Sequence, residues 1–261
     1  MTQIPFTLPH NKEKKMTKEI EKLQEIINNK NNKIVFFGGA GVSTESGIPD
    51  FRSVDGLYNQ KWKYPPEEIL SHHFFKKHTE EFFEFYREKM MCDTAKPNMA
   101  HLKLAELEKT GRLTAIVTQN IDNLHQMAGS KNVLELHGSV HRNYCQKCGE
   151  FYDFDYIKKG DGVPLCLSCG GIIKPDIVLY GEELNFDIWN KAEKHIKEAD
   201  VLIIGGTSLT VYPAATLCQD FAGRHMIIIN KAATDIDHMG DLVINQPIGE
   251  VFKKIEIEDK C

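Results

Sequence analysis

The sequence predicts an α/β fold, in which a parallel sheet carries helices on both faces and is joined to a smaller second lobe. First, short apolar runs alternate with helix-length amphipathic segments along the chain. Second, several of these runs are wholly apolar and β-branched, as expected of strands covered on both faces. Third, two segments interrupt the alternation. The 261 residues are enough for a large domain and a small one.

The elements of the expected sheet follow one another in order. Residues 17–30 carry apolar side chains at helical spacing, and Lys33–Phe37 predicts a buried strand that runs into a glycine-rich loop. Further helices are expected at Met99–Lys109 and Phe186–Ala199. The remaining strands are expected at Thr114–Thr118, Val133–Leu136, Val201–Gly205, Met226–Asn230 and Leu242–Asn245. Sheets of this kind bind ligands at the carboxyl ends of their strands.

The two interrupting segments set the expected domain boundaries. One is a partly helical insertion rich in aromatic and charged residues, and the other contains two CxxC pairs. We expect them to form the small domain, with residues 57–97 as the insertion and residues 141–174 as the CxxC segment. The large domain is then discontinuous and follows an N-terminal extension at residues 1–17; it comprises residues 18–56, 98–140 and 175–261.

Composition excludes several classes of partner. The formal net charge of −5 gives no general attraction to nucleic acid or to an anionic membrane surface. The N-terminus lacks the apolar stretch of a secretory signal, and no apolar run approaches the roughly 20 residues of a membrane helix. Seven cysteines in such a chain are typical of the reducing cytosol. We therefore expect no nucleic-acid or membrane partner. A cytoplasmic location is the default expectation, and we take the chain to be a monomer.

Four cysteines have the spacing of a structural metal site. Cys145 and Cys148 form one CxxC pair, and Cys166 and Cys169 form the other, with 17 residues between the pairs. Two such pairs complete a tetrahedron of thiolates around Zn²⁺ and leave no open coordination position. The pattern favours one structural zinc ion in a zinc ribbon; two redox-active CxxC motifs are the alternative.

The glycine-rich loop after the first strand suggests a phosphate site. Gly38, Gly39 and Gly41 let the backbone approach a pyrophosphate group. The loop differs from the ordinary dinucleotide fingerprint, because Thr44 stands where a third glycine would be. A strand ending in an acidic residue about 20 positions later is also missing, so a dehydrogenase is not favoured.

Several motifs, in order, resemble those of the sirtuin family. GAGVSTESGIPDFRS, which starts at Gly39, looks like the sirtuin signature, and the similarity extends over roughly residues 18 to 252. The other matching segments are TQNIDNLH (118–125), ELHGSV (135–140), KPDIVLYGE (174–182), GTSLTVYPAA (206–215) and IIIN (227–230). The resemblance implies a Rossmann-like NAD-binding domain and an enzyme that uses NAD⁺ as co-substrate. It would transfer the acetyl group of a protein lysine to ADP-ribose, releasing nicotinamide and O-acetyl-ADP-ribose.

The resemblance also implies residue roles. A lone histidine is usually structural, but His137 within ELHG should be the general base for the ribose hydroxyls. Phe51 should shield the ribose after nicotinamide leaves. Without the resemblance, the polar residues after Thr118 could equally cap a helix. The expected NAD⁺ contacts are Gly39, Ala40, Gly41, Thr44, Asp50, Phe51, Arg52, Gln119, Asn120, Ile121, Asp122, Gly206, Thr207, Ser208, Asn230, Lys231 and Ile248. The expected contacts to an extended acetyl-lysine peptide are Val178, Gly181, Glu182, Glu183, Val211 and Tyr212.

Three departures from the family pattern affect these expectations. Gly38 stands where a threonine is expected. Tyr180 replaces the usual phenylalanine and brings a hydroxyl that needs a partner or water. The succinyl-preferring members carry Tyr-x-x-Arg, whereas this chain has Tyr86 followed by Lys89 at the arginine position, and lysine lacks the bidentate fork. Acetyl-lysine is therefore the favoured substrate.

Other functions remain open from the sequence. A protein mono-ADP-ribosyltransferase would cleave NAD⁺ without needing an acyl-lysine, and a deacylase could prefer another acyl group. A zinc-ribbon module that senses NAD⁺ would leave it intact. The first two predict nicotinamide release and the third does not.

Overall fold

The structure, a computed structural model, describes residues 17–51, 56–59 and 62–258. Six strands form one parallel sheet in the order β3-β2-β1-β7-β8-β9. They are β1 (Ile34–Gly38), β2 (Leu113–Thr118), β3 (Val133–Glu135), β7 (Val201–Gly205), β8 (His225–Ile229) and β9 (Leu242–Ile244). The mixed α/β class with a parallel sheet is thus confirmed.

The strand order identifies where this sheet opens. From β1 the chain builds outward through β2 and β3, and it then returns to the other side of β1 to build β7, β8 and β9. This is the order of a doubly wound dinucleotide-binding sheet, whose ligand crevice lies where the direction of building reverses. In this chain the reversal falls between β1 and β7, whose residues are all buried, as their apolar sequences predict.

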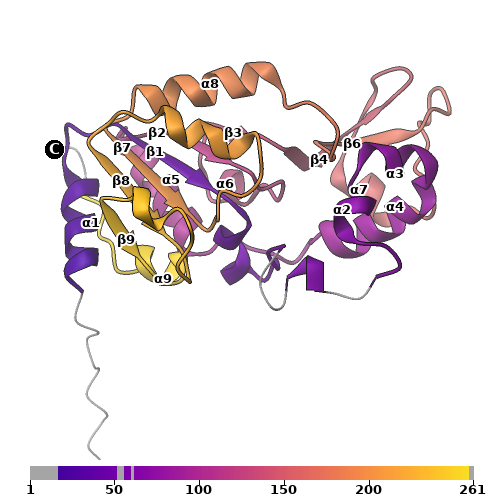
Figure 1. The fold of residues 1–261 in the computed structure, drawn as a ribbon. Helices are drawn as coiled ribbons and strands as arrows, with labels where there is room; N and C mark the ends of the chain where they lie inside the picture. Colours follow the sequence, from indigo (N-terminus) through magenta and orange to yellow (C-terminus); the bar gives the residue numbers. More distant parts are fainter. Residues whose placement is uncertain (1–16, 52–55, 60–61, 259–261) are drawn as a thin grey trace, which may run out of the picture.

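Helices cover both faces of the sheet (Figure 1). Buried side chains of α1 (Lys18–Asn28), α5 (Met99–Lys109) and α9 (Ile248–Phe252) share one core with one face of the strands. The opposite face packs against α8 (Phe186–Lys197) and the 3₁₀ segment η5 (Ala214–Asp220). Of these helices, α5 has the bounds expected from the sequence, and α8 ends two residues earlier than expected.

The smaller lobe lies at one end of the molecule (Figure 1). Its antiparallel sheet, in the order β5-β4-β6, is accompanied by helices from the segment before α5. Aromatic residues of those helices and apolar residues of the sheet form a third core. The lobe contains α2 (Pro66–Ile69), α3 (His72–Lys77), α4 (Thr79–Phe85), the π-helical turn η4 (Tyr86–Met90), β4 (Gly138–Cys145), β5 (Phe151–Tyr152), α7 (Phe154–Lys159) and β6 (Ile173–Ile177).

Two strands of the smaller sheet extend beyond the boundaries expected from the sequence. β4 begins at Gly138, before the boundary after residue 140, and β6 continues to Ile177, past the boundary at residue 175. The smaller sheet therefore begins one residue after His137. The division of the chain into domains itself stays a prediction.

The ends of the large-sheet strands differ from expectation by one residue at most, and one difference has a visible cause. The strand expected at Met226–Asn230 ends instead at Ile229. The Asn230 side chain accepts a hydrogen bond from Thr207 N (3.0 Å) and donates one to Thr207 O (3.1 Å). This residue therefore joins two loops at the edge of the sheet.

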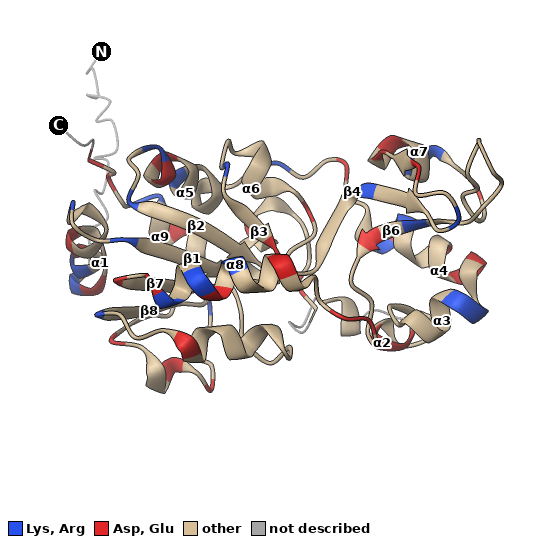
Figure 2. Ribbon diagram, turned by 90° about the horizontal axis from the view of Figure 1, so that it is seen from above, with Lys and Arg blue, Asp and Glu red and all other residues tan. Residues whose placement is uncertain are grey.

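Among the described residues, no helix is long and apolar enough to cross a membrane. Figure 2 shows basic and acidic residues interspersed over both lobes in that view.

Candidate active site between the lobes

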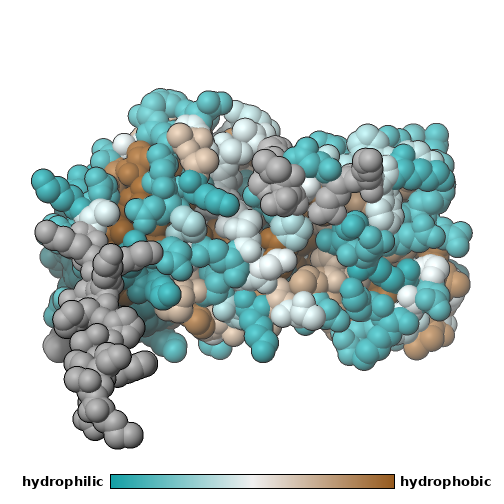
Figure 3. Space-filling view, turned by 90° about the horizontal axis from the view of Figure 1, so that it is seen from below, coloured by the Kyte–Doolittle hydropathy of each residue, from teal (hydrophilic) through white to brown (hydrophobic). Residues whose placement is uncertain are grey.

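A cavity of about 1210 Å³ lies at the carboxyl ends of the central strands, between the sheet and the smaller lobe. It is lined by the loops after β1, β2, β7 and β8, and by residues of η4 and of the segment after β6. Figure 3 shows pale and brown residues across the middle of the lower face, with hydrophilic residues around them. Every expected cofactor and peptide residue that the structure describes lines this cavity except Gly39, whereas Arg52 lies outside the described residues.

Glycines let the loops after β1 and β7 meet. Gly41 N donates to Gly206 O at 2.8 Å, and a Cβ added to Gly41 would lie 2.8 Å from Gly206 Cα. Gly206 has φ +60°, where side chains are unfavourable, and its own Cβ would lie 2.3 Å from Val42 N. Gly39 lies behind the cavity wall, where a Cβ would meet Thr207 Cβ at 2.7 Å. These glycines therefore allow close contact between the two loops at the crevice.

The loop after β2 presents polar side chains to the same cavity. Asp122 accepts a hydrogen bond from Ser43 Oγ at 2.6 Å. Asn120 Nδ2 in turn donates a hydrogen bond to Ser43 Oγ at 3.1 Å. Burial raises the pKa of Asp122, while its bonds from Ser43 and Leu124 N act in the opposite direction. Ser43 therefore joins the glycine-rich loop to the loop after β2.

Gln119 supplies evidence that the cavity suits a polar ligand. Its Oε1 accepts from Thr207 Oγ1 at 3.3 Å, which fixes the orientation of the amide. Its Nε2 is buried and finds no hydrogen-bond partner among the described residues. A buried donor of this kind is costly unless a ligand or water satisfies it. Together with the glycine loops, this donor fits the pyrophosphate and hydroxyl groups of a dinucleotide.

His137 follows β3 and lies on the cavity wall with one ring nitrogen fixed. Its Nδ1 lies 3.0 Å from Gln119 O, and because a carbonyl can only accept, Nδ1 carries the proton. In the neutral ring, Nε2 is then the basic nitrogen. Burial lowers the pKa of His137, and the Gln119 bond opposes this only in part, so the ring is neutral near pH 7. The geometry therefore provides a neutral imidazole, suited to accepting a proton.

The segment after β6 is held firmly by Glu182. Its carboxylate accepts hydrogen bonds from Lys174 Nζ and from Leu179 N, both at 3.0 Å, and it lies 2.8 Å from His72 Nδ1. The Glu182 carboxylate therefore fixes residues 178–183 to the smaller lobe. Glu182 also lines the cavity.

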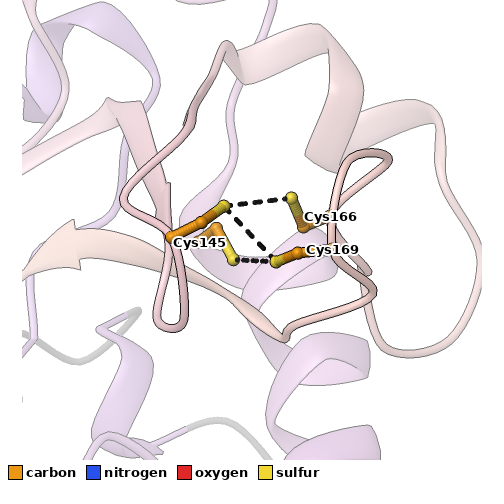
Figure 4. Close-up of side chains that lie close together, drawn as sticks. Cys145, Cys166 and Cys169 are labelled. Carbon is orange, nitrogen blue, oxygen red and sulfur yellow. Dashed lines mark hydrogen bonds between the residues drawn. The ribbon is translucent and has the colours of Figure 1, made fainter.

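The four cysteines converge on one point at the distal end of the smaller lobe. Figure 4 shows the cysteine side chains brought together from two loops, with Cys145, Cys166 and Cys169 labelled. All four sulfur atoms lie within 4.8 Å of one another, and three of the separations are 3.3–3.5 Å. Zn–S bonds of about 2.3 Å give a tetrahedral S–S edge of about 3.8 Å. The cluster therefore suits one structural zinc ion. Four thiolates leave that ion without the open coordination position that catalysis would need.

Some cavity residues were not assigned from the sequence. Ser43 lies within the signature motif, and its position beside Thr44 was the signal that could have identified it. Tyr58 comes from a segment without a motif, and Lys89, which stands at the arginine position of the succinyl-preferring pattern, was not assigned to the site. By contrast, Arg87 points away from the cavity, since its Nε donates to Ile157 O at 2.8 Å. Tyr86 is fully buried and is not part of the cavity wall.

Comparison with known proteins shows which family this chain resembles in sequence and in fold. The model of the Sir2 family matches residues 39–213. The NAD-dependent protein deacetylase of Clostridium acetobutylicum is 58% identical over 240 residues, which cover 91% of this chain and 98% of that protein. A solved complex of Sir2 with a p53 peptide and NAD⁺ is 40% identical, covers 90% of this chain and 96% of the other, and superimposes with a TM-score of 0.79. A Sir2 variant with a deacetylated p53 peptide and 3′-O-acetyl-ADP-ribose has the same identity and coverage and a TM-score of 0.81.

Proposed function

Because this chain belongs to the Sir2 family, we infer that it is an NAD-dependent protein deacetylase. The observation that carries the inference is the position of the His137 imidazole on the cavity wall, with one ring nitrogen already bonded to the backbone. His137 Nδ1 is bonded to Gln119 O, which leaves Nε2 as the base, in the same cavity as the glycine loops. NAD⁺ would supply the electrophilic ribose carbon that accepts the acetyl oxygen of the lysine amide, releasing nicotinamide.

We propose roles for the chain's residues in this cavity. The loops that contain Gly41 and Gly206 would hold the pyrophosphate, because their backbone can approach its negatively charged oxygens closely. Gln119 would donate its unpaired Nε2 proton to a hydroxyl of the ligand. His137 would remove a ribose hydroxyl proton, and Phe51 would cover the ribose face against water. These residues act by positioning, by excluding water and by moving one proton.

The remaining expected contacts complete the proposed dinucleotide and peptide sites. We propose that the acetyl-lysine peptide lies between the segment after β6 and the loop after β7, both of which line the cavity. The proposed NAD⁺ contacts are Gly39, Ala40, Thr44, Asp50, Arg52, Asn120, Ile121, Asp122, Thr207, Ser208, Asn230, Lys231 and Ile248, and the proposed peptide contacts are Val178, Gly181, Glu182, Glu183, Val211 and Tyr212. Gly39 acts through loop packing in this proposal, because it lies behind the wall.

We propose acetyl-lysine as the preferred substrate. Lys89 lines the cavity, but its Nζ is paired with Glu88 at 2.9 Å and lies 5.6 Å from the Trp62 ring centre. A distal carboxylate on the acyl chain would have to compete with Glu88 for a single ammonium group, and Tyr86 is buried away from it. Faster turnover of a succinyl-peptide than of an acetyl-peptide would contradict this preference.

The test of the proposed function is direct. The protein is incubated with NAD⁺ and acetyl-lysine peptide, and the products are identified by mass. We expect equal amounts of nicotinamide, deacetylated peptide and O-acetyl-ADP-ribose, with nicotinamide release dependent on the peptide. Nicotinamide release without peptide, accompanied by ADP-ribosylated protein, would favour the mono-ADP-ribosyltransferase instead.

We further propose that the enzyme acts on protein as a cytoplasmic monomer. The interspersed charges and the net charge of −5 give no electrostatic footprint for nucleic acid or an anionic membrane. The reduced thiols of the cysteine cluster fit a reducing compartment. Size-exclusion chromatography with light scattering should give a mass near 29.7 kDa, and a dimer mass would contradict the monomer.

A further inference from the structure

Tyr180 carries a hydroxyl where the family pattern has phenylalanine, and the structure shows its partner. Tyr58 Oη lies 2.9 Å from Tyr180 Oη, although the two residues are 122 positions apart in the chain. Both residues line the cavity. The two hydroxyls therefore bridge two separate walls of the proposed active site.

Tyr180 is fixed to the smaller lobe. Its backbone N donates to Leu70 O at 2.9 Å, and its carbonyl accepts from His72 N at 2.9 Å. His72 in turn lies 2.8 Å from the Glu182 carboxylate, which holds the same segment. Tyr180 is thus part of the wall proposed to bind the acetyl-lysine peptide, and its backbone has little freedom.

Tyr58 is tied to Phe51. Its backbone N donates to Phe51 O at 3.0 Å, and the two rings meet edge to face with centres 5.6 Å apart. Leu57 N donates to Asp50 O at 2.9 Å, so two consecutive backbone bonds join η3 (Leu57–Asn59) to the segment of Phe51. The placement of the Phe51 ring therefore depends on where Tyr58 lies.

We propose that the Tyr58–Tyr180 hydroxyl pair positions Phe51 and couples peptide binding to NAD⁺ binding. A peptide seated along residues 178–183 would restrain Tyr180, and the hydroxyl pair passes this restraint to Tyr58 and on to Phe51. By linkage, a ligand in the ribose site that contacts Phe51 must then strengthen peptide binding by the same factor. This inference rests on the proposed function and names positioning residues for it.

The contact suits coupling better than general stabilisation of the fold. Tyr180 is 43% exposed, so its hydroxyl can turn to water when the hydroxyl of Tyr58 is removed. Removing the pair should then change the fold's stability little. Because one hydrogen bond contributes a net amount that corresponds to about two- to tenfold in an equilibrium constant, the coupling factor should fall by about that much.

A double-mutant cycle tests the proposal with full-length protein. The variants are Tyr58→Phe, Tyr180→Phe and the double variant, and the measured quantity is the dissociation constant of an acetyl-lysine peptide with and without saturating ADP-ribose. ADP-ribose contains the ribose and pyrophosphate but cannot react. We expect ADP-ribose to tighten peptide binding in the parent, each single variant to lose about two- to tenfold of that factor, and the double variant to lose no more.

Tyr144→Phe is the matched control. It removes a hydroxyl from a 39% exposed tyrosine on β4, outside the cavity wall, and should keep the parent's coupling factor. Melting temperatures of all four variants should stay close to that of the parent. A parent without coupling, single variants that couple like the parent, or losses that add in the double variant would each overturn the proposal.

Turnover of the parent separates this proposal from the proposed function. If the parent does not deacetylate the peptide with NAD⁺, the proposed function fails. If the parent turns over and Tyr180→Phe keeps the coupling factor, only the positioning role of the hydroxyl pair fails.

Discussion

Gly206→Ala is the substitution for which the structure gives the clearest expected penalty. A Cβ at this position would lie 2.3 Å from Val42 N and 2.6 Å from Gly41 C, both backbone atoms that no rotamer change can move. The residue also has φ +60°, which costs an L-residue about 1–2 kcal/mol. Forcing the two loops apart adds about 1–3 kcal/mol, the usual range for overpacking. The free energy of unfolding should therefore fall by about 2–5 kcal/mol.

Gly162→Ala is the matched control. Gly162 also has φ +60°, but an added Cβ there would meet no heavy atom of the described chain within 4 Å. The difference between the two variants in urea unfolding therefore isolates the contact between the loops of β1 and β7. Gly206→Ala should in addition raise the KM for NAD⁺, while Gly162→Ala should not. Equal losses of unfolding free energy in the two variants would refute the close packing of these loops.

Three further predictions follow from the site and its surroundings. Since burial lowers the pKa of His137, the acid limb of kcat/KM against pH should be centred below 6.5, and a limb centred above that value would contradict the assignment. Burial also lowers the pKa of His101 to about 4 and holds that of His125 well below 6.5, so the unfolded state binds more protons than the folded state as the pH falls from about 6.5 towards 4. The free energy of unfolding should therefore fall as the pH drops through this range, and a His125→Asn variant should show a shallower fall in urea titrations; an unchanged slope would speak against the buried neutral pair. Cys166→Ser should reduce bound zinc below one ion per chain, measured by atomic absorption, and lower the unfolding midpoint; zinc content equal to the parent's would contradict the four-thiolate site.

Much of the large sheet could be predicted from the sequence, because its strands are buried on both faces. The run Val201–Gly205 has the predicted bounds, and each of its residues is buried. The end of β8 was placed one residue too late, because Asn230 bonds to Thr207, and only the folded chain brings these two residues together. A buried strand can thus be predicted from its own apolar residues. The residue at which a strand ends depends on contacts with residues distant in the chain.

The metal cluster was also predictable, since its chemistry depends on local spacing. The CxxC pairs set the geometry of each half, and the fold has only to bring the halves together. The residues that line the cavity were harder to predict from the sequence. Ser43 lies within the signature motif, but the motif does not reveal that its Oγ bonds to Asp122 and Asn120 in the loop after β2. The contact between Tyr58 and Tyr180 is equally hidden, because it joins segments that are distant in the chain.

The most direct test of the account is the single-turnover rate of deacetylation in His137→Ala. If Nε2 of this ring is the base, the rate should fall by about 10²–10⁴, while zinc content and peptide affinity stay at the parent's values. His73→Ala, which removes an exposed histidine from α3, should keep the parent's rate. A His137→Ala protein that deacetylates the peptide at nearly the parent's rate would contradict the account.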